Sequence, residues 1–367
     1  MTERMILFVG CRNRAAQGAP ATKGRGISVL GFDPKSGAAQ PISETLGIDN
    51  PTFLAVDPER LCLYATSEVA GWCEGIVSAY RFNPATNTLV YLNKQPTLGS
   101  TTAYLGLTHD RRFLLAANYA DGSAVGGPNQ AVVVFPIRGD GSLAPASGTV
   151  AHHGSGADSR RQAGPHAHCV IPSPDDRFAL VADLGIAALY AHRLTGDGQL
   201  EPGAPFPMAA GSGPRHLALH PSGGALYAIN ELDSTVTVLA FDGANGSFRS
   251  VQTLSTLPPD ATGVNHTAGL QLTPDGRFLY GSNRGHDSIA IFAVDAATGR
   301  LTALGHRPCG GKTPRAVGID PGGRCLLVAN QNSDTVVIFR IDRDNGALAA
   351  IGRIEIGTPM CVAFLAL

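Results

Sequence analysis

The stretch GPRHLALHPSGGALYAINE, residues 213–231, sets a pattern that the rest of the chain repeats. It predicts two antiparallel strands, because the apolar-rich run RHLALH ends at the turn cluster Pro221-Ser-Gly-Gly and ALYAIN returns from that turn. Nine residues separate Pro221 from Asn230. The same interval recurs from Pro58 to Ser67, His109 to Asn118, Pro174 to Asp183, Pro274 to Asn283 and Pro321 to Asn330. The chain therefore carries six copies of one unit.

Each copy continues in the same way after its second strand. A β-rich run follows, such as TVTVLAFD, SIAIFAVD or TVVIFRID, and then a Gly-containing turn and a weaker fourth strand. Successive copies lie 47 to 65 residues apart, and apolar spacing of helical period is nowhere sustained. Four strands at such a period are typical of the blade of a β-propeller.

The two ends of the chain supply a seventh unit. IGTPMCVAFLAL at the C-terminus is similar to the first strand of a unit, and MILFVGCR and GISVLGFDP near the N-terminus are similar to its second and third strands. We therefore expect an all-β fold in one domain, residues 1–367: a seven-bladed β-propeller with four antiparallel strands per blade. A blade built from both ends closes the ring, because neither end strand can leave without exposing unpaired backbone on its neighbour.

The composition fits a turn-dense, all-β protein. Hydrophobic residues make up 44% of the chain and charged residues 16%, with 45 Gly, 25 Pro and a formal net charge of -1. Without a basic excess, nucleic acid and membrane surfaces are not expected as partners. No apolar run approaches the roughly 18 residues of a spanning helix, and MTERMILFVGCRNR lacks a secretory apolar core, so we expect a cytoplasmic protein.

The cysteines indicate neither a disulfide framework nor a zinc site. Their number is odd, they are dispersed, and no two of them form a CxxC pair. They are Cys11, Cys62, Cys73, Cys169, Cys309, Cys325 and Cys361.

Two positions of each blade converge at one mouth of the ring. The first strand of a blade lines the central channel and the second runs antiparallel to it, so the start of one lies beside the end of the other. The residue just after the nine-residue interval is, in successive units, Glu68, Tyr119, Leu184, Glu231, Arg284 and Gln331. The residue six positions before the turn is Thr52, Ala103, His168, Arg215, Ala268 and Arg315. These positions vary and are rich in ionisable groups, as expected of a site built on a symmetric scaffold.

Four of these residues form the candidate catalytic group: His168, Arg215, Glu231 and Arg284. A histidine titrates near neutrality, and a carboxylate can accept a proton or orient an imidazole. Two guanidiniums can hold an anionic group or a developing oxyanion. The alternative is structural: Arg215 and Glu231 form an ion pair that braces adjacent strands, and His168 caps a strand.

His166 competes with His168 in the segment GPHAHCV. By analogy with GPR and TPR, the residue after Pro165 would be the channel residue, whereas counting back from Pro174 selects His168, which we favour. Alternation along a strand points both histidines the same way, so both can reach the site. A metal site at this pair is a weaker interpretation, because no carboxylate or third histidine lies at an obvious ligand spacing.

Long polar insertions add further candidates around the same mouth. Five insertions belong there: residues 12–26, 71–75, 121–129, 151–164 and 258–266. We expect substrate contacts from channel positions and nearby loop residues, namely His166, Glu68, Tyr119, Asn265, His266, His286, Gln331 and Arg315. A phosphorylated substrate would need a basic pocket, for which the chain offers Arg12, Lys23, Arg25, Arg160, Arg161, Lys312 and Arg315.

Several segments carry a family resemblance. GPHAHCVIPSPDDRF, GPRHLALHPSGGALYAINELDSTVTV, LTPDGRFLYGSNRGHDSIAIF and TPRAVGIDPGGRCLLVANQNSDTVVIFRID resemble the seven-bladed propeller lactonase family. This family includes the bacterial propeller-type 6-phosphogluconolactonases and is related to the fungal carboxy-muconate cyclases. The resemblance implies hydrolysis of a sugar lactone without a metal or cofactor, at a site of one histidine, two arginines and one glutamate that falls on His168, Arg215, Glu231 and Arg284. The 151–164 insertion and the segment CRNRAAQGAPATKGRG depart from the family pattern.

Three classes of function follow. The first is hydrolysis of a small-molecule sugar lactone, 6-phosphogluconolactone or an unphosphorylated aldonolactone, with Glu231 or His168 as the base and arginines at the oxyanion. The second is a cyclase or isomerase acting on a muconate-type lactone with the same four residues. The third is a non-catalytic binding propeller, although the WD dipeptide of such proteins is absent. The sequence decides neither the phosphorylation of the substrate nor the oligomeric state.

Overall fold

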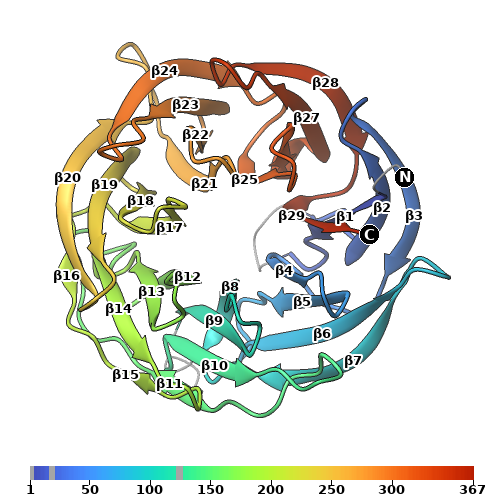
Figure 1. Cartoon of the computed structure of the whole chain (residues 1–367), viewed down its shortest axis with the longest axis horizontal. Helices are drawn as coiled ribbons and strands as arrows, with labels where there is room; N and C mark the ends of the chain where they lie inside the picture. Colours follow the sequence, from blue (N-terminus) through green and yellow to red (C-terminus); the bar gives the residue numbers. More distant parts are fainter. Residues whose placement is uncertain (1–3, 16–20, 121–126) are drawn as a thin grey trace.

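The strands form a closed ring of seven sheets (Figure 1), in a computed structural model that describes residues 4–15, 21–120 and 127–367. Within this part of the chain, six sheets have four antiparallel strands and one carries a short fifth strand. The predicted all-β, seven-bladed propeller is therefore confirmed.

The sheets are numbered as blades 1 to 7 in chain order. Blade 1 comprises β29 (Pro359–Ala366), β1 (Met5–Cys11), β2 (Ile27–Asp33) and β3 (Ala38–Thr45), and blade 2 comprises β4 (Leu54–Asp57), β5 (Cys62–Ser67), β6 (Ile76–Asn83) and β7 (Thr88–Pro96). Blade 3 comprises β8 (Ser100–Leu107), β9 (Phe113–Ala120), β10 (Val132–Pro136) and β11 (Gly148–Val150). Blade 4 comprises β12 (Ala167–Pro172), β13 (Phe178–Asp183), β14 (Ala188–Leu194), β15 (Leu200–Glu201) and β16 (Phe206–Pro207).

The last three blades follow the same order. Blade 5 comprises β17 (Pro214–Leu219), β18 (Ala225–Asn230), β19 (Thr235–Asp242) and β20 (Ser247–Ser255). Blade 6 comprises β21 (His266–Leu272), β22 (Phe278–Arg284), β23 (Ser288–Val294) and β24 (Leu301–Pro308). Blade 7 comprises β25 (Pro314–Ile319), β26 (Cys325–Asn330), β27 (Thr335–Ile341) and β28 (Leu348–Glu355).

The ring is closed by the two ends of the chain. Strand β29 pairs antiparallel with β1, with Met5 opposite Ala366 and Gly10 opposite Cys361. The backbone N–H of Leu367 also donates to the carbonyl of Arg4 at 2.9 Å. The predicted closing blade is confirmed, and separating its end strands would break a full ladder of hydrogen bonds.

The nine-residue interval ends at a buried anchor in the second strand of blades 2 to 7. In β18 the anchor Asn230 is 1% exposed, and its Nδ2 donates to Oγ1 of Thr235 at 2.8 Å. In β9 the anchor Asn118 donates to the carbonyl of Thr97 at 2.7 Å. Because a buried amide has to find its partners inside the protein, the distance from turn to anchor stays constant.

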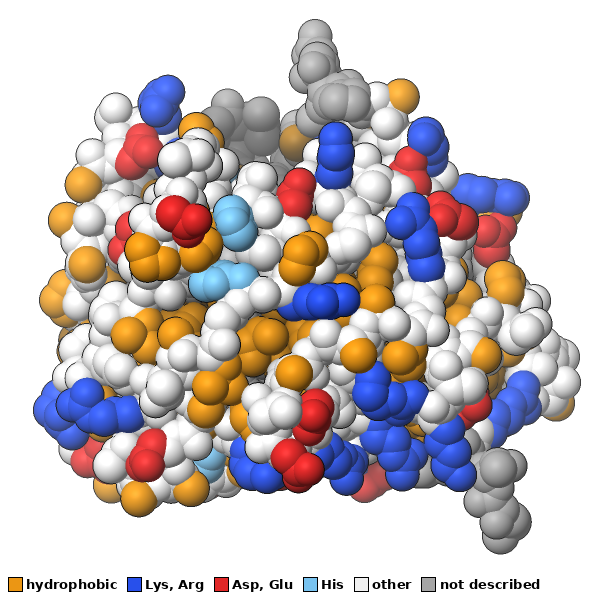
Figure 2. Space-filling view, turned by 90° about the horizontal axis from the view of Figure 1, so that it is seen from above, with side chains coloured by type: hydrophobic (Ala, Val, Ile, Leu, Met, Phe, Trp, Pro, Cys, Tyr) orange, Lys and Arg blue, Asp and Glu red, His pale blue; other side chains and the backbone are white. Residues whose placement is uncertain are grey.

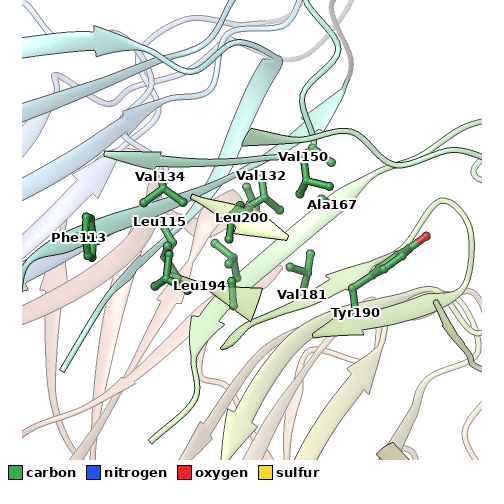
Figure 3. Close-up of a cluster of buried hydrophobic side chains, with 14 of the residues drawn as sticks. Phe113, Leu115, Val132, Val134, Val150, Ala167, Val181, Tyr190, Leu194 and Leu200 are labelled. Atoms are coloured by element: carbon green, nitrogen blue, oxygen red, sulfur yellow. The ribbon is translucent and has the colours of Figure 1, made fainter. Parts of the chain in front are cut away.

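The hydrophobic core lies between neighbouring blades. One cluster joins Val132 and Val134 of blade 3 to Val181 and Tyr190 of blade 4 (Figure 3). Hydrogen bonds reinforce such contacts, as where the hydroxyl of Tyr227 in blade 5 donates to a carbonyl of blade 6 at 3.0 Å. Each blade therefore depends on its neighbours for the burial of its faces.

The side of the ring is mixed in charge. Figure 2 shows basic and acidic side chains interspersed over this face, in keeping with a net charge of -1. In the described part of the chain, no helix has the length and apolar character needed to cross a membrane.

Candidate active site

A cavity of about 270 Å³ opens at one mouth of the central channel. Its lining comes from six blades and consists of Glu68, Tyr119, Arg161, His168, Glu231, His266, Arg284 and Arg315. Most of these residues begin a first strand or end a second strand, and the first strands are the innermost in Figure 1. A larger hollow of about 510 Å³ lies between β2, β3 and β28, but no histidine lines it.

The carboxylate of Glu231 is the electrostatic centre of this cavity. Its Oε2 lies 2.9 Å from Nε of Arg215 and 2.8 Å from Nη2 of Arg284. Its Oε1 accepts a hydrogen bond from Nη2 of Arg161 at 2.6 Å. The Arg215 contact is an ion pair without hydrogen-bond geometry, since among the described residues Nε of Arg215 has no hydrogen-bond partner. The Glu231 side chain is 5% exposed, so three guanidiniums surround a carboxylate that water barely reaches.

A β-bulge at the start of the first strand aims the inner residues of several blades. The strand register shifts between Ala167 and Cys169 in blade 4 and between Pro214 and His216 in blade 5. The extra residues at these shifts are His168 and Arg215, and Arg315 occupies the same place in blade 7. A bulge redirects one side chain out of the regular alternation. This repeated irregularity explains why counting from the turn finds the channel residues.

His168 enters the cavity as a neutral imidazole. It is 6% exposed, and among the described residues its Nδ1 has no hydrogen-bond partner. The ring of Tyr119 meets it edge-on, with centroids 5.4 Å apart. Burial, followed by the positive charges of Arg215 and Arg315, lowers the pKa of His168 well below its ordinary value. The imidazole is therefore unprotonated at neutral pH, which is the state that a general base needs.

Burial and neighbouring charges also fix the ionisation of Glu231. Burial alone would raise its pKa, but the guanidiniums around it, above all Arg284, outweigh that effect and hold the pKa below its ordinary value. Burial and then Arg284 lower the pKa of Arg215 to about 9, so this residue stays cationic at neutral pH. Both oxygens of this carboxylate are already occupied by guanidiniums, which favours His168 as the base.

Four of the predicted substrate-binding residues line the cavity: Glu68, Tyr119, His266 and Arg315. Nη2 of Arg315 lies 3.4 Å from Oε1 of Glu68, and each side chain of this pair is 19% exposed. Among the described residues, Nδ1 of His266 is buried without a hydrogen-bond partner. These four residues add further polar groups to the cavity lining.

Four other predicted substrate-binding residues lie outside the lining. His166 stacks on Tyr119 with centroids 4.5 Å apart, and its Nδ1 lies 2.6 Å from the Tyr119 carbonyl. Regular strand alternation would have brought His166 to the cavity beside His168, but the bulge after Ala167 breaks this alternation. The amide of Asn265 donates to the anchor amide of blade 6 at 3.1 Å, and Nδ1 of His286 lies 2.7 Å from a serine hydroxyl. Gln331 lines a separate hollow of about 350 Å³.

Comparison with known proteins assigns the family. Residues 6–364 match the family model described as "Lactonase, 7-bladed beta-propeller". The chain belongs to this lactonase family. The 6-phosphogluconolactonase of Bacillus subtilis is 34% identical over 298 residues, which cover 80% of this chain and 81% of that protein. The 6-phosphogluconolactonase of Formosa agariphila is 32% identical over 303 residues, with 81% and 83% covered.

A solved structure extends the likeness to the whole ring. The periplasmic gluconolactonase of Pseudomonas aeruginosa superposes with a TM-score of 0.89 at 34% identity, and the match covers 99% of each chain. The family resemblance seen in the sequence segments is thereby confirmed, and with it the lactonase class of enzyme.

Arg161 belongs to this lactonase cavity although it occupies none of the channel positions. It lies on the 151–164 insertion, and its guanidinium reaches Glu231 and, at 3.4 Å, the hydroxyl of Tyr119. The signal in the sequence was a pair of arginines in a long polar insertion. Residues 16–20 and 121–126, which belong to two other predicted mouth insertions, lie outside the described residues.

The cavity offers no cluster of metal ligands. Residues 4–15, 21–120 and 127–367 contain no group of three or more His, Cys, Asp or Glu side chains that could hold a metal ion. The metal interpretation of His166 and His168 therefore finds no third ligand among these residues. What the lactonase cavity does offer is a neutral base, a fixed anion and guanidiniums that can stabilise negative charge.

Proposed function

We propose that this chain hydrolyses an aldonolactone to the open-chain acid, in the manner of the 6-phosphogluconolactonases and without a metal ion. The observation that carries the proposal is the neutral, buried imidazole of His168 in one cavity with the guanidinium of Arg284. Hydrolysis of a ring ester needs a group that activates water and a group that stabilises the oxyanion. These two side chains supply both.

In the first step, the imidazole of His168 takes a proton from water while the water oxygen bonds to the carbonyl carbon of the lactone. The carbonyl oxygen becomes an oxyanion, which Arg284 stabilises by charge and hydrogen bonding. In the second step, the bond between that carbon and the ring oxygen breaks, and the ring oxygen takes the proton from the imidazolium. An imidazolium whose pKa is lowered by burial is a strong acid, so this return of the proton is favourable.

Glu231 organises the cavity by charge. Its carboxylate pairs with the guanidiniums of Arg215 and Arg284, and the Arg215 side chain is only 3% exposed. Arg284 is further held by a hydrogen bond from Nη2 to the Thr267 carbonyl at 2.8 Å. A donor fixed in this way does not need to reorient as the oxyanion forms.

Acid release from a panel of lactones tests the proposal. The panel contains glucono-, galactono- and 6-phosphogluconolactone, assayed by pH-stat, corrected for spontaneous hydrolysis and repeated with a chelator. We expect acceleration of at least one lactone, with a rate that the chelator leaves unchanged. Acceleration of none would overturn the proposal, and loss of activity with the chelator would overturn its metal-free form.

We also propose that the enzyme works in the cytoplasm, in the pentose phosphate pathway of carbohydrate metabolism. The relatives named 6-phosphogluconolactonase support this role. Six buried cysteine thiols, among them Cys169 and Cys325, support a reducing compartment. The similar gluconolactonase of Pseudomonas aeruginosa is periplasmic, so fractionation of the source cells against compartment markers decides the point. Recovery with periplasmic markers would contradict the cytoplasmic placement.

A further inference from the structure

The guanidinium of Arg161 is the most accessible of those that surround Glu231. Its side chain is 34% exposed, against 16% for Arg284 and 3% for Arg215. Both of its side-chain contacts in the described part of the chain, to Glu231 at 2.6 Å and to the Tyr119 hydroxyl at 3.4 Å, are made by Nη2. A guanidinium has five N–H donors, so most of the hydrogen-bonding capacity of Arg161 is unused by the described residues.

The cavity carries more positive charge than the reaction on a neutral lactone requires. Four arginines stand in or directly behind its lining, against two glutamates, which leaves an excess of two positive charges: Arg161, Arg215, Arg284 and Arg315 against Glu68 and Glu231. Hydrolysis of an uncharged lactone develops one negative charge, on the carbonyl oxygen. The excess therefore fits a substrate that carries an anionic substituent of its own.

Arg161 can give up its contact with Glu231 without leaving the charge of that carboxylate uncompensated. Arg215 and Arg284 both remain within 2.9 Å of Oε2 of Glu231, so the buried charge stays compensated. A new anion would then meet a guanidinium that has given up one partner and that can bind phosphate through two parallel N–H groups.

The backbone that carries Arg161 is fixed, so the exchange needs only its side chain to move. The N–H of Arg161 donates to the carbonyl of Asp158 at 3.2 Å. The next residue, Gln162, is 0% exposed, and its Nε2 donates to the carbonyl of Leu184 in blade 4 at 2.7 Å. The insertion thus holds Arg161 over the cavity while leaving its end accessible.

We propose that Arg161 binds the phosphate of a phosphorylated aldonolactone, exchanging its contact with Glu231 for the substrate, and so determines the preference for phosphorylated over unphosphorylated lactones. This inference rests on the proposed lactonase activity. It assigns Arg161 a role in specificity that is separate from the chemical step at His168 and Arg284.

The test compares Arg161→Ala and Arg161→Lys with Arg160→Ala, a change at the neighbouring exposed arginine of the same insertion. The measured quantity is the ratio of kcat/KM for 6-phosphogluconolactone to kcat/KM for gluconolactone. We expect Arg161→Ala to lower this ratio about ten- to a hundredfold, the loss expected for a hydrogen-bonded charge pair. Arg161→Lys restores part of the ratio because it keeps the charge and loses the two-pronged geometry. Arg160→Ala leaves the ratio unchanged.

Binding of the acid products provides a second readout that does not depend on turnover. Calorimetry with 6-phosphogluconate and with gluconate should show that Arg161→Ala weakens binding of the phosphorylated acid selectively. An equal loss on both substrates or both acids would overturn the inference, as would a wild-type enzyme that prefers gluconolactone. In both cases the proposed lactonase function would stand, whereas a wild-type enzyme inactive on the whole panel would instead overturn that function.

Discussion

Nδ1 of His152 lies 2.6 Å from Oδ2 of Asp183, and both side chains are shielded from solvent. The other oxygen of the same carboxylate accepts the backbone N–H of His166 at 2.7 Å. His152 lies at the start of the 151–164 insertion that carries Arg161, and His166 lies two residues after its end. One buried carboxylate thus holds both ends of the loop that completes the cavity.

A second histidine fixes the proton positions in this network. The N–H of Gly203 donates to Nδ1 of His192 at 3.0 Å, and Nε2 of His192 lies 2.9 Å from Nε2 of His152. Burial and then His152 lower the pKa of His192 to about 3, so His192 is neutral and its remaining proton is on Nε2. His152 then accepts at Nε2 and donates from Nδ1 to Asp183, and each donor has one acceptor.

Replacing Asp183 by Asn should loosen the insertion and lower turnover. The amide NH₂ would face the Nδ1–H of His152, two donors against each other, with an expected cost of about 2 kcal/mol in the free energy of unfolding. Amide hydrogen exchange across residues 152–166 should accelerate, and KM for the lactone should rise. Asp175→Asn, at an exposed turn of the same blade, is the matched control. Unchanged exchange in the insertion would show that the carboxylate does not hold it.

The same network should make stability depend on pH. The pKa of His192 is about 3 in the folded chain and about 6.5 in an unfolded one, so below neutrality only the unfolded chain binds this proton. The free energy of unfolding should therefore fall by about 1.4 kcal/mol for each pH unit below about 6.5 on account of this residue alone. Urea unfolding between about pH 7.5 and about pH 5.5 measures the slope.

His192→Gln should be less stable than the wild type at neutral pH but lose less stability on acidification, because it cannot bind the proton. His153→Gln removes an exposed histidine from the same insertion and should keep the wild-type slope. Equal slopes for all three proteins would contradict the assignment of this pH dependence to His192.

The repeat could be read from the sequence because its cause is local. A turn and a buried anchor such as Asn230 must stay nine residues apart for the anchor to reach its partners, and the bulge at His168 and Arg215 keeps a fixed place relative to the turn. Counting along the sequence from each turn therefore identified residues that are far apart in the chain but lie together in the cavity. The bulge itself carries no sequence signal, which is why the sequence left His166 as a competitor of His168 and predicted that both could reach the site.

The rest of the site depends on contacts that counting cannot supply. Arg161 lies on an insertion without a counterpart in the other blades, so no register predicts that it reaches Glu231. Conversely, Asn265 and His286 have the right residue types near the mouth, but their side chains are used in hydrogen bonds to other residues of blades 5 and 6. The sequence shows which residues near the mouth are polar. It does not show which of their side chains are already used in structural hydrogen bonds and which are free to bind a substrate.

Arg284→Ala should lower kcat by about a hundredfold or more while the fold is retained, because the variant removes the oxyanion donor. Arg215 and Arg161 still compensate Glu231 in this variant. Arg249→Ala, on the outer strand β20, removes an exposed arginine as the control. Initial rates of acid release measure the turnover of each variant, and its thermal unfolding midpoint shows whether the fold is retained. Turnover that survives in a folded Arg284→Ala protein would remove this residue from the mechanism.

The pH profile should identify the base. Because burial lowers the pKa of His168 well below its ordinary value, the imidazole stays unprotonated through neutrality and is protonated only in acid. Activity should therefore be level from about pH 8 to about pH 6 and decline at lower pH, further into acid than an ordinary histidine would allow. His168→Gln should lose about a hundredfold or more in kcat, and the small remaining rate should show no acid decline.

The pH profile of Glu231→Gln should be compared with that of His168→Gln. It leaves the imidazole in place, so the acid decline should persist, although the rate falls because the guanidiniums of Arg215 and Arg284 lose the charge that positions them. The two variants separate the roles of a proton acceptor and of a fixed anion, which a loss of rate alone cannot do. If the acid decline instead vanished in Glu231→Gln and persisted in His168→Gln, the carboxylate would be the base and the imidazole its support.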